Sequence, residues 1–460
     1  MKTMSNIDLQ TFYQSTNPTN TIKASNPDEK SYYIDFSPVR GGPLIEKIQK
    51  KITLLAPNDP TCVLFTGHIG CGKSTELLRL QYELEQKGFH VIYCVSTDDL
   101  EMNDVDVSDI LLMIAANIAK SLQQITIPEP KTFNSILKEA AKLLNTEIDV
   151  TNIKFGVPKN PIFPEGIKVE ADNTGKFSLA FGIGEITAQT KSDATLRHRL
   201  NEYLGPQKNR LIDAINNELL LPAIQQLKEQ GKKGLVVIVD NLDRLDNRAK
   251  PSGRPQQEYI FIDQGEYLSK LKCHLLYTMP LALKFVNDYG TLTQRFDEPR
   301  VLPMVCTHNK DGEISEQGMA LLRQMVLARA FPKLSETERL DKINEVFDEP
   351  ATLDRLCIIS GGHVRELLQL LNRWIEDETD LPLTRPTLET LIIYRRNERK
   401  LSISDDEWEL LKKVQKTKKV SGDQEYQTLI RSRLVFQYRQ TDGDSWFDIH
   451  PILIGCEELQ

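Results

Sequence analysis

Residues 62 to 75 read Cys62-Val63-Leu64-Phe65-Thr66-Gly67-His68-Ile69-Gly70-Cys71-Gly72-Lys73-Ser74-Thr75. The first four residues are apolar and predict a buried strand, and the closely spaced glycines predict a tight loop after it. Leu77, Leu80 and Leu84 follow at helical spacing, so we expect a helix directly behind the loop. A second apolar run at residues 91–95 completes a strand–loop–helix–strand unit, which is typical of parallel α/β sheets.

The stretch from Gly67 to Ser74 fits the pattern GxxxxGK[ST] of phosphate-binding loops. Glycines let the backbone N–H groups turn inward around phosphate oxygens, and the N-terminus of the following helix favours negative charge. We expect Lys73 to reach the β- and γ-phosphates and Ser74 to offer its hydroxyl to Mg²⁺. A glycine-rich turn that matches by chance is disfavoured by the strand before it and the helix after it. The expected nucleotide-binding residues here are Gly67, Gly70, Cys71, Gly72, Lys73, Ser74 and Thr75.

A second motif follows the most apolar strand of the chain, residues 235–239. Asp240 ends this strand, so it should lie at the C-terminal edge of the sheet, where it can bind Mg²⁺ directly or through water. The alternative is an aspartate that caps a strand end. Asn241 stands where many related proteins place a catalytic glutamate, so we predict that Asp243 positions the attacking water. A salt bridge between Asp243 and Arg244 is the competing interpretation.

These motifs, together with Gly361-Gly362-His363-Val364-Arg365, resemble the AAA+/STAND group of P-loop ATPases. The stretch from Asp240 to Arg244 is also similar to the KAP ATPases. The resemblance implies that Thr278 is a polar sensor of the γ-phosphate and that Arg365 is a second sensor in a helical lid. A strand-end hydroxyl and a solvated helix charge are the respective alternatives.

The same resemblance implies that Val39 and Arg40 border the adenine, although a simple entry turn would also explain this segment. Arg295 and Arg300 stand where an arginine finger for a neighbouring subunit would lie, but plain surface charges are preferred for both. Self-association is therefore left open.

The predicted fold class is α/β: a parallel five-stranded P-loop NTPase sheet with helices on both faces. An inserted β-containing subdomain, a helical lid and a C-terminal winged-helix-like module complete it. Within the insertion, residues 167–170 and 177–181 predict a β-hairpin around Asp172-Asn173-Thr174-Gly175. The expected divisions are a flexible arm at 1–30, the ATPase domain at 31–124 and 193–306, the insertion at 125–192, the lid at 307–400 and the winged-helix-like module at 401–460.

Composition limits the class of protein. The formal net charge is −8, which argues weakly against non-specific coating of nucleic acid. The seven cysteines form no CxxC pair, and no apolar run approaches the roughly 20 residues of a membrane span. The N-terminal residues lack the apolar core of a signal peptide. We therefore expect a cytoplasmic protein with reduced thiols and no membrane contact.

Three functions stay open at this point. The leading one is an ATPase switch, with ATP and Mg²⁺ as cofactors, slow turnover and a protein partner or effector; the resemblance implies a role in bacterial signalling or antiviral defence. The second is a DNA-binding assembly factor similar to replication-initiator or transposition-helper ATPases. It would use the lysines after the helix that starts at Asp405, namely Lys412, Lys413, Lys416, Lys418 and Lys419. A solvated helix face is the preferred interpretation of this run, because acidic residues surround it. The third is a nucleotide-binding scaffold without turnover.

Overall fold

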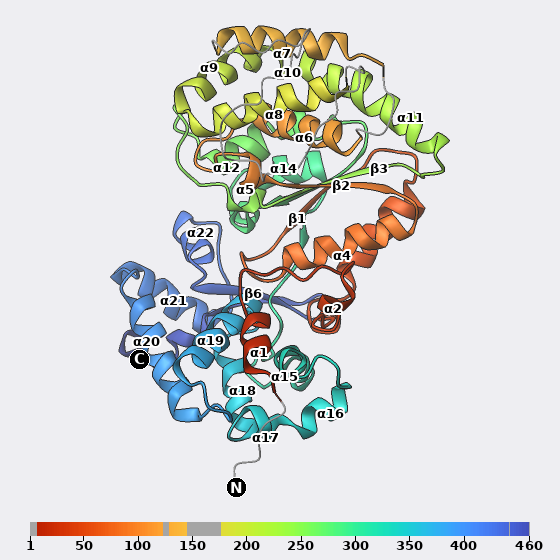
Figure 1. Cartoon of the computed structure of the whole chain (residues 1–460). Coiled ribbons are helices and arrows are strands. Elements are labelled where there is room, and N and C mark those ends of the chain that lie inside the picture. Colours follow the sequence, from red (N-terminus) through yellow and green to blue (C-terminus); the bar gives the residue numbers. More distant parts are fainter. Residues whose placement is uncertain (1–6, 123–127, 145–175, 441, 460) are drawn as a thin grey trace.

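The computed structural model describes residues 7–122, 128–144, 176–440 and 442–459, and for residues 176–182 and 185 only the course of the backbone. Figure 1 shows two bodies. One holds the sheet and the helices that cover it. The other holds the C-terminal third of the chain together with the first helix, α1 (Leu9–Ser15). None of the helices described is long and apolar enough to cross a lipid bilayer.

The sheet contains five parallel strands in the order β2-β3-β4-β1-β5. This confirms the predicted α/β class. The strand β4 lies between β1 and β3, so the loop after β1 and the carboxylate at the end of β3 meet across one intervening strand. The strands are β1 (Cys62–Thr66), β2 (His90–Val95), β3 (Leu235–Asp240), β4 (His274–Met279) and β5 (Arg300–Val301).

The last strand, β5, is short. Arg300 and Val301 pair with β1, and Leu302 N donates to Thr66 O of β1 at 2.7 Å. Pro303 has no N–H to donate, and the next amides leave the sheet: Met304 N donates to Gln437 O at 3.0 Å and Val305 N to Gly362 O at 3.3 Å. The chain after β5 therefore joins the sheet to the C-terminal body.

Helices cover both faces of the sheet, as predicted. On one face α3 (Leu44–Lys50) and α4 (Lys73–Gln86) pack their apolar residues on Val63 and Phe65. The other face carries Leu64 and Val237 under a helical layer. This layer contains α6 (Val107–Ser121), α7 (Lys131–Leu143), α8 (Lys176–Ser192), α9 (Ala194–Leu204), α10 (Lys208–Ala214) and α11 (Leu221–Glu229).

The predicted hairpin of the insertion is wrong in its second half. Residues 177–181 lie in α8, whereas residues 167–170 fall outside the described part of the chain. The alternation at 177–181 spans only five residues, and the buried residues that follow it, Ile183, Ile186 and Thr190, recur at helical spacing. The described part of the insertion is helical.

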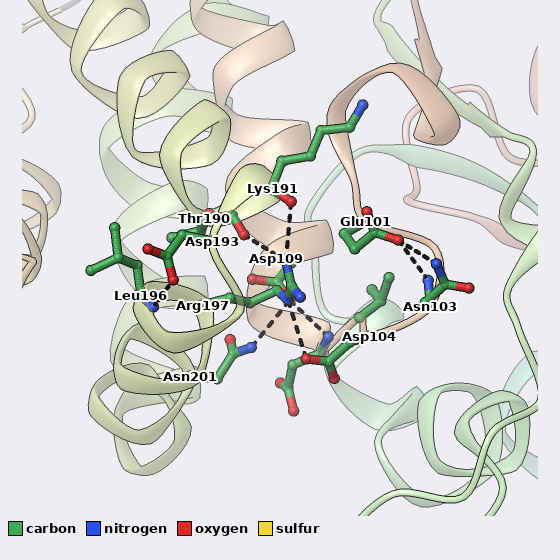
Figure 2. Close-up of polar contacts among 12 residues, drawn as sticks. Glu101, Asn103, Asp104, Asp109, Thr190, Lys191, Asp193, Leu196, Arg197 and Asn201 are labelled. Carbon is green, nitrogen blue, oxygen red and sulfur yellow. Dashed lines mark hydrogen bonds and ion pairs between the residues drawn. The ribbon is translucent and has the colours of Figure 1, made fainter.

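Charged side chains fasten α8 and α9 to the segment between β2 and α6. Figure 2 shows Arg197 between Asp104, whose carboxylate lies 3.2 Å from Nε, and the carbonyls of Thr190 and Lys191. Asn201 donates to the buried Asp109 at 3.2 Å. These contacts set the position of the α8–α9 junction.

Residues 7–30, expected to form a loose arm, contain α1 and α2 (Pro27–Lys30) instead. Phe12 is buried in the core of the C-terminal body. Arg329 Nε donates to Ser15 O at 3.1 Å, and Asn372 Nδ2 donates to Tyr13 O at 3.2 Å. Apolar residues at helical spacing on α1 thus dock the arm onto the predicted lid.

The lid and the C-terminal module share one hydrophobic core, in which Trp374 lies with Trp408 and Val435. In the module, two helices precede an antiparallel pair of strands. The winged-helix assignment stays a prediction. The lid helices are α15 (Glu316–Ala330), α16 (Glu336–Asp341), α17 (Ile343–Val346), α18 (Pro350–Ile359), α19 (Val364–Asp377) and α20 (Arg385–Lys400). The module contains α21 (Asp405–Thr417), α22 (Gln424–Arg431), β6 (Val435–Arg439) and β7 (Ser445–Ile449).

The hairpin of β6 and β7 is packed between the C-terminal body and the ATPase body, and its large aromatic side chains are buried. Phe436, Tyr438 and Trp446 pack into the core that also contains Ile45 and Met304 of the ATPase body. The remaining short helices are α5 (Ser96–Asp99), α12 (Gln256–Glu258), α13 (Gly265–Leu268), α14 (Tyr289–Phe296), η1 (Ser37–Val39), η2 (Lys51–Leu55), η3 (Gly205–Gln207), η4 (Ile215–Leu220), η5 (Leu242–Arg244), η6 (Tyr259–Asp263), η7 (Leu281–Phe285), η8 (Pro451–Leu453) and η9 (Glu457–Leu459).

Candidate functional site

The glycine-rich loop joins β1 to α4, as the sequence predicted. Gly72 immediately precedes α4 with φ 106° and Gly70 has φ 91°, a region that side-chain-bearing residues rarely adopt. At Gly70 an added Cβ would also lie 2.5 Å from Cε1 of His363 in the lid. The loop backbone is therefore in direct contact with the lid.

Lys73 is buried under this loop. Its Nζ donates to Gly67 O at 2.8 Å and to His68 O at 2.9 Å, and lies 2.9 Å from Asp243 Oδ2. Burial acts to lower the pKa of Lys73, but the Asp243 and Asp240 carboxylates outweigh it and raise the pKa overall. The other oxygen of Asp243, Oδ1, is buried and has no hydrogen-bond partner among the described residues, so it can accept a proton from a water molecule.

Asp240 is held in a fixed orientation at the end of β3. Tyr93 Oη donates to its Oδ2 at 2.8 Å, and Asn241 N donates to its Oδ1 at 2.7 Å. Burial, followed by the Asp240 carboxylate, raises the pKa of Tyr93, so this phenol stays protonated and donates. Tyr93 was not predicted from the sequence, although its hydroxyl stands out among the apolar residues Val91, Ile92, Cys94 and Val95 of β2.

The donor set at this edge suits magnesium. Magnesium prefers oxygen ligands and keeps one or two carboxylates together with phosphate oxygens and water. Asp240 supplies a carboxylate and Ser74 a hydroxyl, and Asp240 is near enough to Lys73 to raise its pKa. Among the described residues no three His, Cys, Asp or Glu side chains form a closed metal site. A bound ion would thus depend on the nucleotide for its remaining ligands.

Thr278 lies at the end of β4, beside Asp240 as expected. Its hydroxyl accepts from Leu242 N at 3.0 Å and donates to Val239 O at 3.4 Å, and the side chain is fully buried. In this arrangement Thr278 secures the turn that carries Asp243. Its role as a γ-phosphate sensor stays a prediction.

Two residues of the lid hold the loop backbone. His363 Nε2 lies 2.9 Å from Ile69 O, which can only accept, while Glu366 N donates to Nδ1 at 3.0 Å. These partners require the neutral tautomer with the proton on Nε2. Burial, with the nearby Arg433 as the next cause, lowers the pKa of His363 to about 3. Arg365 N donates to Gly70 O at 3.2 Å, so the N-terminus of α19 is seated on the loop.

A cavity joins these elements. The predicted residues that line it are Gly70, Gly72, Lys73, Ser74, Thr75, Asp243 and Arg365. The sequence analysis missed Arg244, and it missed Pro18, Asn20 and Thr21 of the arm, whose types carry no motif that points to nucleotide. Asp240 is 2% exposed and does not line this cavity.

Val39 and Arg40 do not line this cavity. Val39 is buried, and its carbonyl accepts from Cys306 N at 3.4 Å. The Arg40 guanidinium is buried over the ring of Phe36, with Nε and Nη2 unpartnered. Burial lowers the pKa of Arg40. Their contact with adenine stays a prediction.

Sheet order, loop and strand-end carboxylate together define a nucleotide-binding P-loop NTPase domain. Residues 42–249 match the model of the KAP family P-loop domain, and this range contains both nucleotide motifs. The match confirms the KAP similarity predicted from the stretch at Asp240. It covers less than half of the chain, so the lid and the C-terminal module lie outside it.

Two solved structures are similar in outline. The Aeropyrum pernix ORC2 protein, in ADPNP–ADP complexes, has 12% identity and a TM-score of 0.39, with 90% of this chain and 91% of that chain covered. The Aeropyrum pernix ORC1 protein in complex with DNA has 13% identity and a TM-score of 0.32, with 88% of each chain covered. Scores this low support no conclusion about function. A search of curated proteins gave no match.

Proposed function

We propose that this protein is an ATP-hydrolysing switch in which the terminal phosphate of Mg-ATP controls the contact between the P-loop and the lid. One observation carries the proposal: the first turn of α19 bonds to the loop backbone at Ile69 and Gly70. Any ligand that reshapes the loop must therefore alter how the lid is seated.

The ion pair of Lys73 and Asp243 suggests how nucleotide starts the reaction. When phosphate enters the cavity, the Lys73 ammonium group gives up its contacts with Asp243 and the loop carbonyls and binds phosphate oxygens instead. Asp243 then has both carboxylate oxygens free to orient a water molecule and accept its proton. Magnesium, held by Asp240 and Ser74, would neutralise phosphate charge. Arg365 of the lid lines the same cavity, so its guanidinium would also stabilise the negative charge of the phosphate.

The switch is preferred over the DNA-binding alternative because the C-terminal module is engaged with its own chain. Lys412 and Lys418 pair with Glu409 at 2.8 Å and Asp448 at 2.7 Å, and the hairpin is buried. We therefore infer a protein partner that reads lid position. A role in bacterial signalling or antiviral defence stays a proposal that rests on the family resemblance, and a cytoplasmic location stays one that rests on composition.

Steady-state ATP turnover tests the assignment. Lys73→Ala should lose turnover and weaken nucleotide binding, while Asp243→Asn should keep binding and lose at least tenfold in kcat. The control is Lys87→Ala, an exposed lysine at the other end of the same helix α4, which should behave like the wild type. Equal rates in all four proteins would refute the site.

A further inference from the structure

Arg433 is an unusual residue for its place in the backbone. It follows α22 at the position that ends the helix: Leu434 N donates to Leu429 O at 2.9 Å and Arg433 N to Ile430 O at 3.2 Å. This helix-ending arrangement needs a positive φ and usually employs glycine, yet Arg433 has φ 60°. A side chain at this position strains the backbone instead of stabilising it, so the presence of an arginine requires a reason other than helix termination.

Arg433 lines a second cavity, which adjoins the nucleotide cavity. The two cavities share Ile69, Asp243 and Arg244, and the second adds Gly67 and His68 of the loop. Lys73 Nζ bonds to the carbonyls of Gly67 and His68, so the tip of the phosphate-binding lysine lies at the boundary of the two cavities. Because that lysine reaches the β- and γ-phosphates, the boundary is where a terminal phosphate would lie.

Positive groups outnumber carboxylates around this boundary, because Glu366, the carboxylate that Arg433 influences, is already paired with Arg399 at 3.0 Å. Within the described part of the chain, no hydrogen bond or ion pair holds the guanidinium of Arg244, Arg365 or Arg433. The three cations are close enough that Arg244 and Arg433, after burial, lower the pKa of Arg365. Asp243 is the carboxylate that both cavities share, and Lys73 already pairs with it. A multiply charged phosphate is the ligand class that would balance such a group.

We propose that Arg433 of the C-terminal module binds the terminal phosphate of a nucleotide held in the same chain and stabilises its charge during hydrolysis. This inference rests on the proposed ATPase function. In the step, the water oxygen forms a bond to the γ-phosphorus while the bond from that phosphorus to the bridging oxygen breaks. The electron pair stays on ADP, and the water proton passes to Asp243. Arg433 then loses its ligand when phosphate leaves, which couples the module to turnover.

Arg433→Gly is the decisive variant, because glycine removes the guanidinium and relieves the positive-φ strain at the same time. We expect its unfolding midpoint in urea to equal or exceed that of the wild type. We also expect its affinity for ADP to stay within about threefold and its kcat to fall about a thousandfold, at the lower end of the effect of arginines that stabilise charge in phosphoryl transfer. Arg433→Lys should be intermediate, since lysine keeps the charge without the two-pronged contact.

The matched control is Arg431→Ala. Arg431 lines the same second cavity from the same helix, but Nη2 donates to Gln427 at 3.0 Å. It should keep kcat within about threefold. A second measurement is binding of ADP with aluminium fluoride, which mimics the phosphoryl group in transfer. The wild type should prefer it to ADP alone, and Arg433→Gly should lose that preference.

Three outcomes would overturn the inference: an unchanged kcat in Arg433→Gly, an equal loss in Arg431→Ala, or a parallel loss of ADP affinity. An unchanged kcat in Arg433→Gly would show that Arg433 does not contact the phosphate. An equal loss in Arg431→Ala would indicate a general electrostatic effect, and a parallel loss of ADP affinity would indicate a structural role. A wild type that neither binds nor hydrolyses ATP would instead refute the proposed function itself.

Discussion

The sheet edge that carries the site is held by two neighbours of different chemistry. On the lid side, neutral groups make the contacts: the His363 ring on Ile69 O and the Arg365 amide on Gly70 O. On the side of α8 and α9, charged groups do so: Arg197 binds Asp104, and Lys191 donates to Thr97 O at 3.0 Å. Neutral backbone contacts exchange with a ligand at little electrostatic cost, whereas a half-buried charge network resists rearrangement. Under the proposed switch, we therefore expect the lid contact to move and the α8–α9 junction to stay fixed.

The largest expected effect is on the fixed side. Arg197→Ala leaves the carbonyls of Thr190 and Lys191 without a donor and Asp104 with only Lys250, so the free energy of unfolding should fall by about 3 kcal/mol. Arg199→Ala, on the exposed face of the same helix, should change it by less than about 0.5 kcal/mol. Urea denaturation measures both, and equal values would show that the junction is not held by charge.

The two sides should respond to pH in opposite directions. His363 has a pKa of about 3 in the fold against 6.5 unfolded, so its stabilisation is complete above pH 6.5 and is lost as the pH falls. Burial raises the pKa of Asp109 to about 7 from 3.8, so its contribution is complete below pH 3.8 and is lost as the pH rises through 7.

Each residue changes the free energy of unfolding by about 2 kcal/mol between pH 7 and pH 5. Relative to the wild type, Asp109→Asn should therefore lose stability as the pH falls over this interval, and His363→Gln should gain it. Parallel unfolding curves for the three proteins would contradict the assignment.

Separating the lid from the loop should reduce catalysis more than folding. In Gly70→Ala the new Cβ would lie 2.5 Å from His363 Cε1, so lid contact and loop shape are both disturbed, and kcat should fall at least tenfold, about 1.4 kcal/mol. Gly231→Ala is the matched control, because Gly231 has φ 83° but no neighbour within 4 Å of the new Cβ. It should lose about 1 kcal/mol of stability and no activity.

The smallest effect on kcat concerns the magnesium carboxylate. Tyr93→Phe removes the donor to Asp240 Oδ2 but keeps Asn241 N on Oδ1. The loss of one hydrogen bond to a charged group, about 1.5 kcal/mol, should raise the Mg²⁺ concentration for half-maximal turnover about tenfold, with the kcat at saturating Mg²⁺ nearly unchanged. A fall in kcat that excess Mg²⁺ does not restore would assign Tyr93 a different role.

Local pattern was enough to predict the sheet and the centre of the site. Apolar runs predicted the strands, and the spacing of Gly67 to Ser74 and the position of Asp240 predicted which loops meet. Arg365 was placed beside the loop only through the family resemblance, since no local pattern links residues this far apart.

Contacts over long sequence separations were not predictable in this way. The hairpin that packs on the P-loop through Gln437 N and His68 Nε2 at 3.0 Å joins residues 369 positions apart. Docking of the arm depends on Phe12 finding the lid core, which the amphipathic pattern of one short helix does not specify. The strand predicted at 177–181 failed because five alternating residues are compatible with either period once neighbouring helices bury them.

Hydrogen exchange on the nucleotide-bound protein tests the central claim most directly, namely that the terminal phosphate sets the contact between P-loop and lid. Amide protection in residues 67–75 and 363–368 would be compared for the free protein, the ADP complex and the complex with a non-hydrolysable ATP analogue, all with Mg²⁺. We expect both segments to change together, and we expect the analogue and ADP to give different protection in the first turn of α19. Identical protection in the two complexes, or a change confined to the loop, would contradict it.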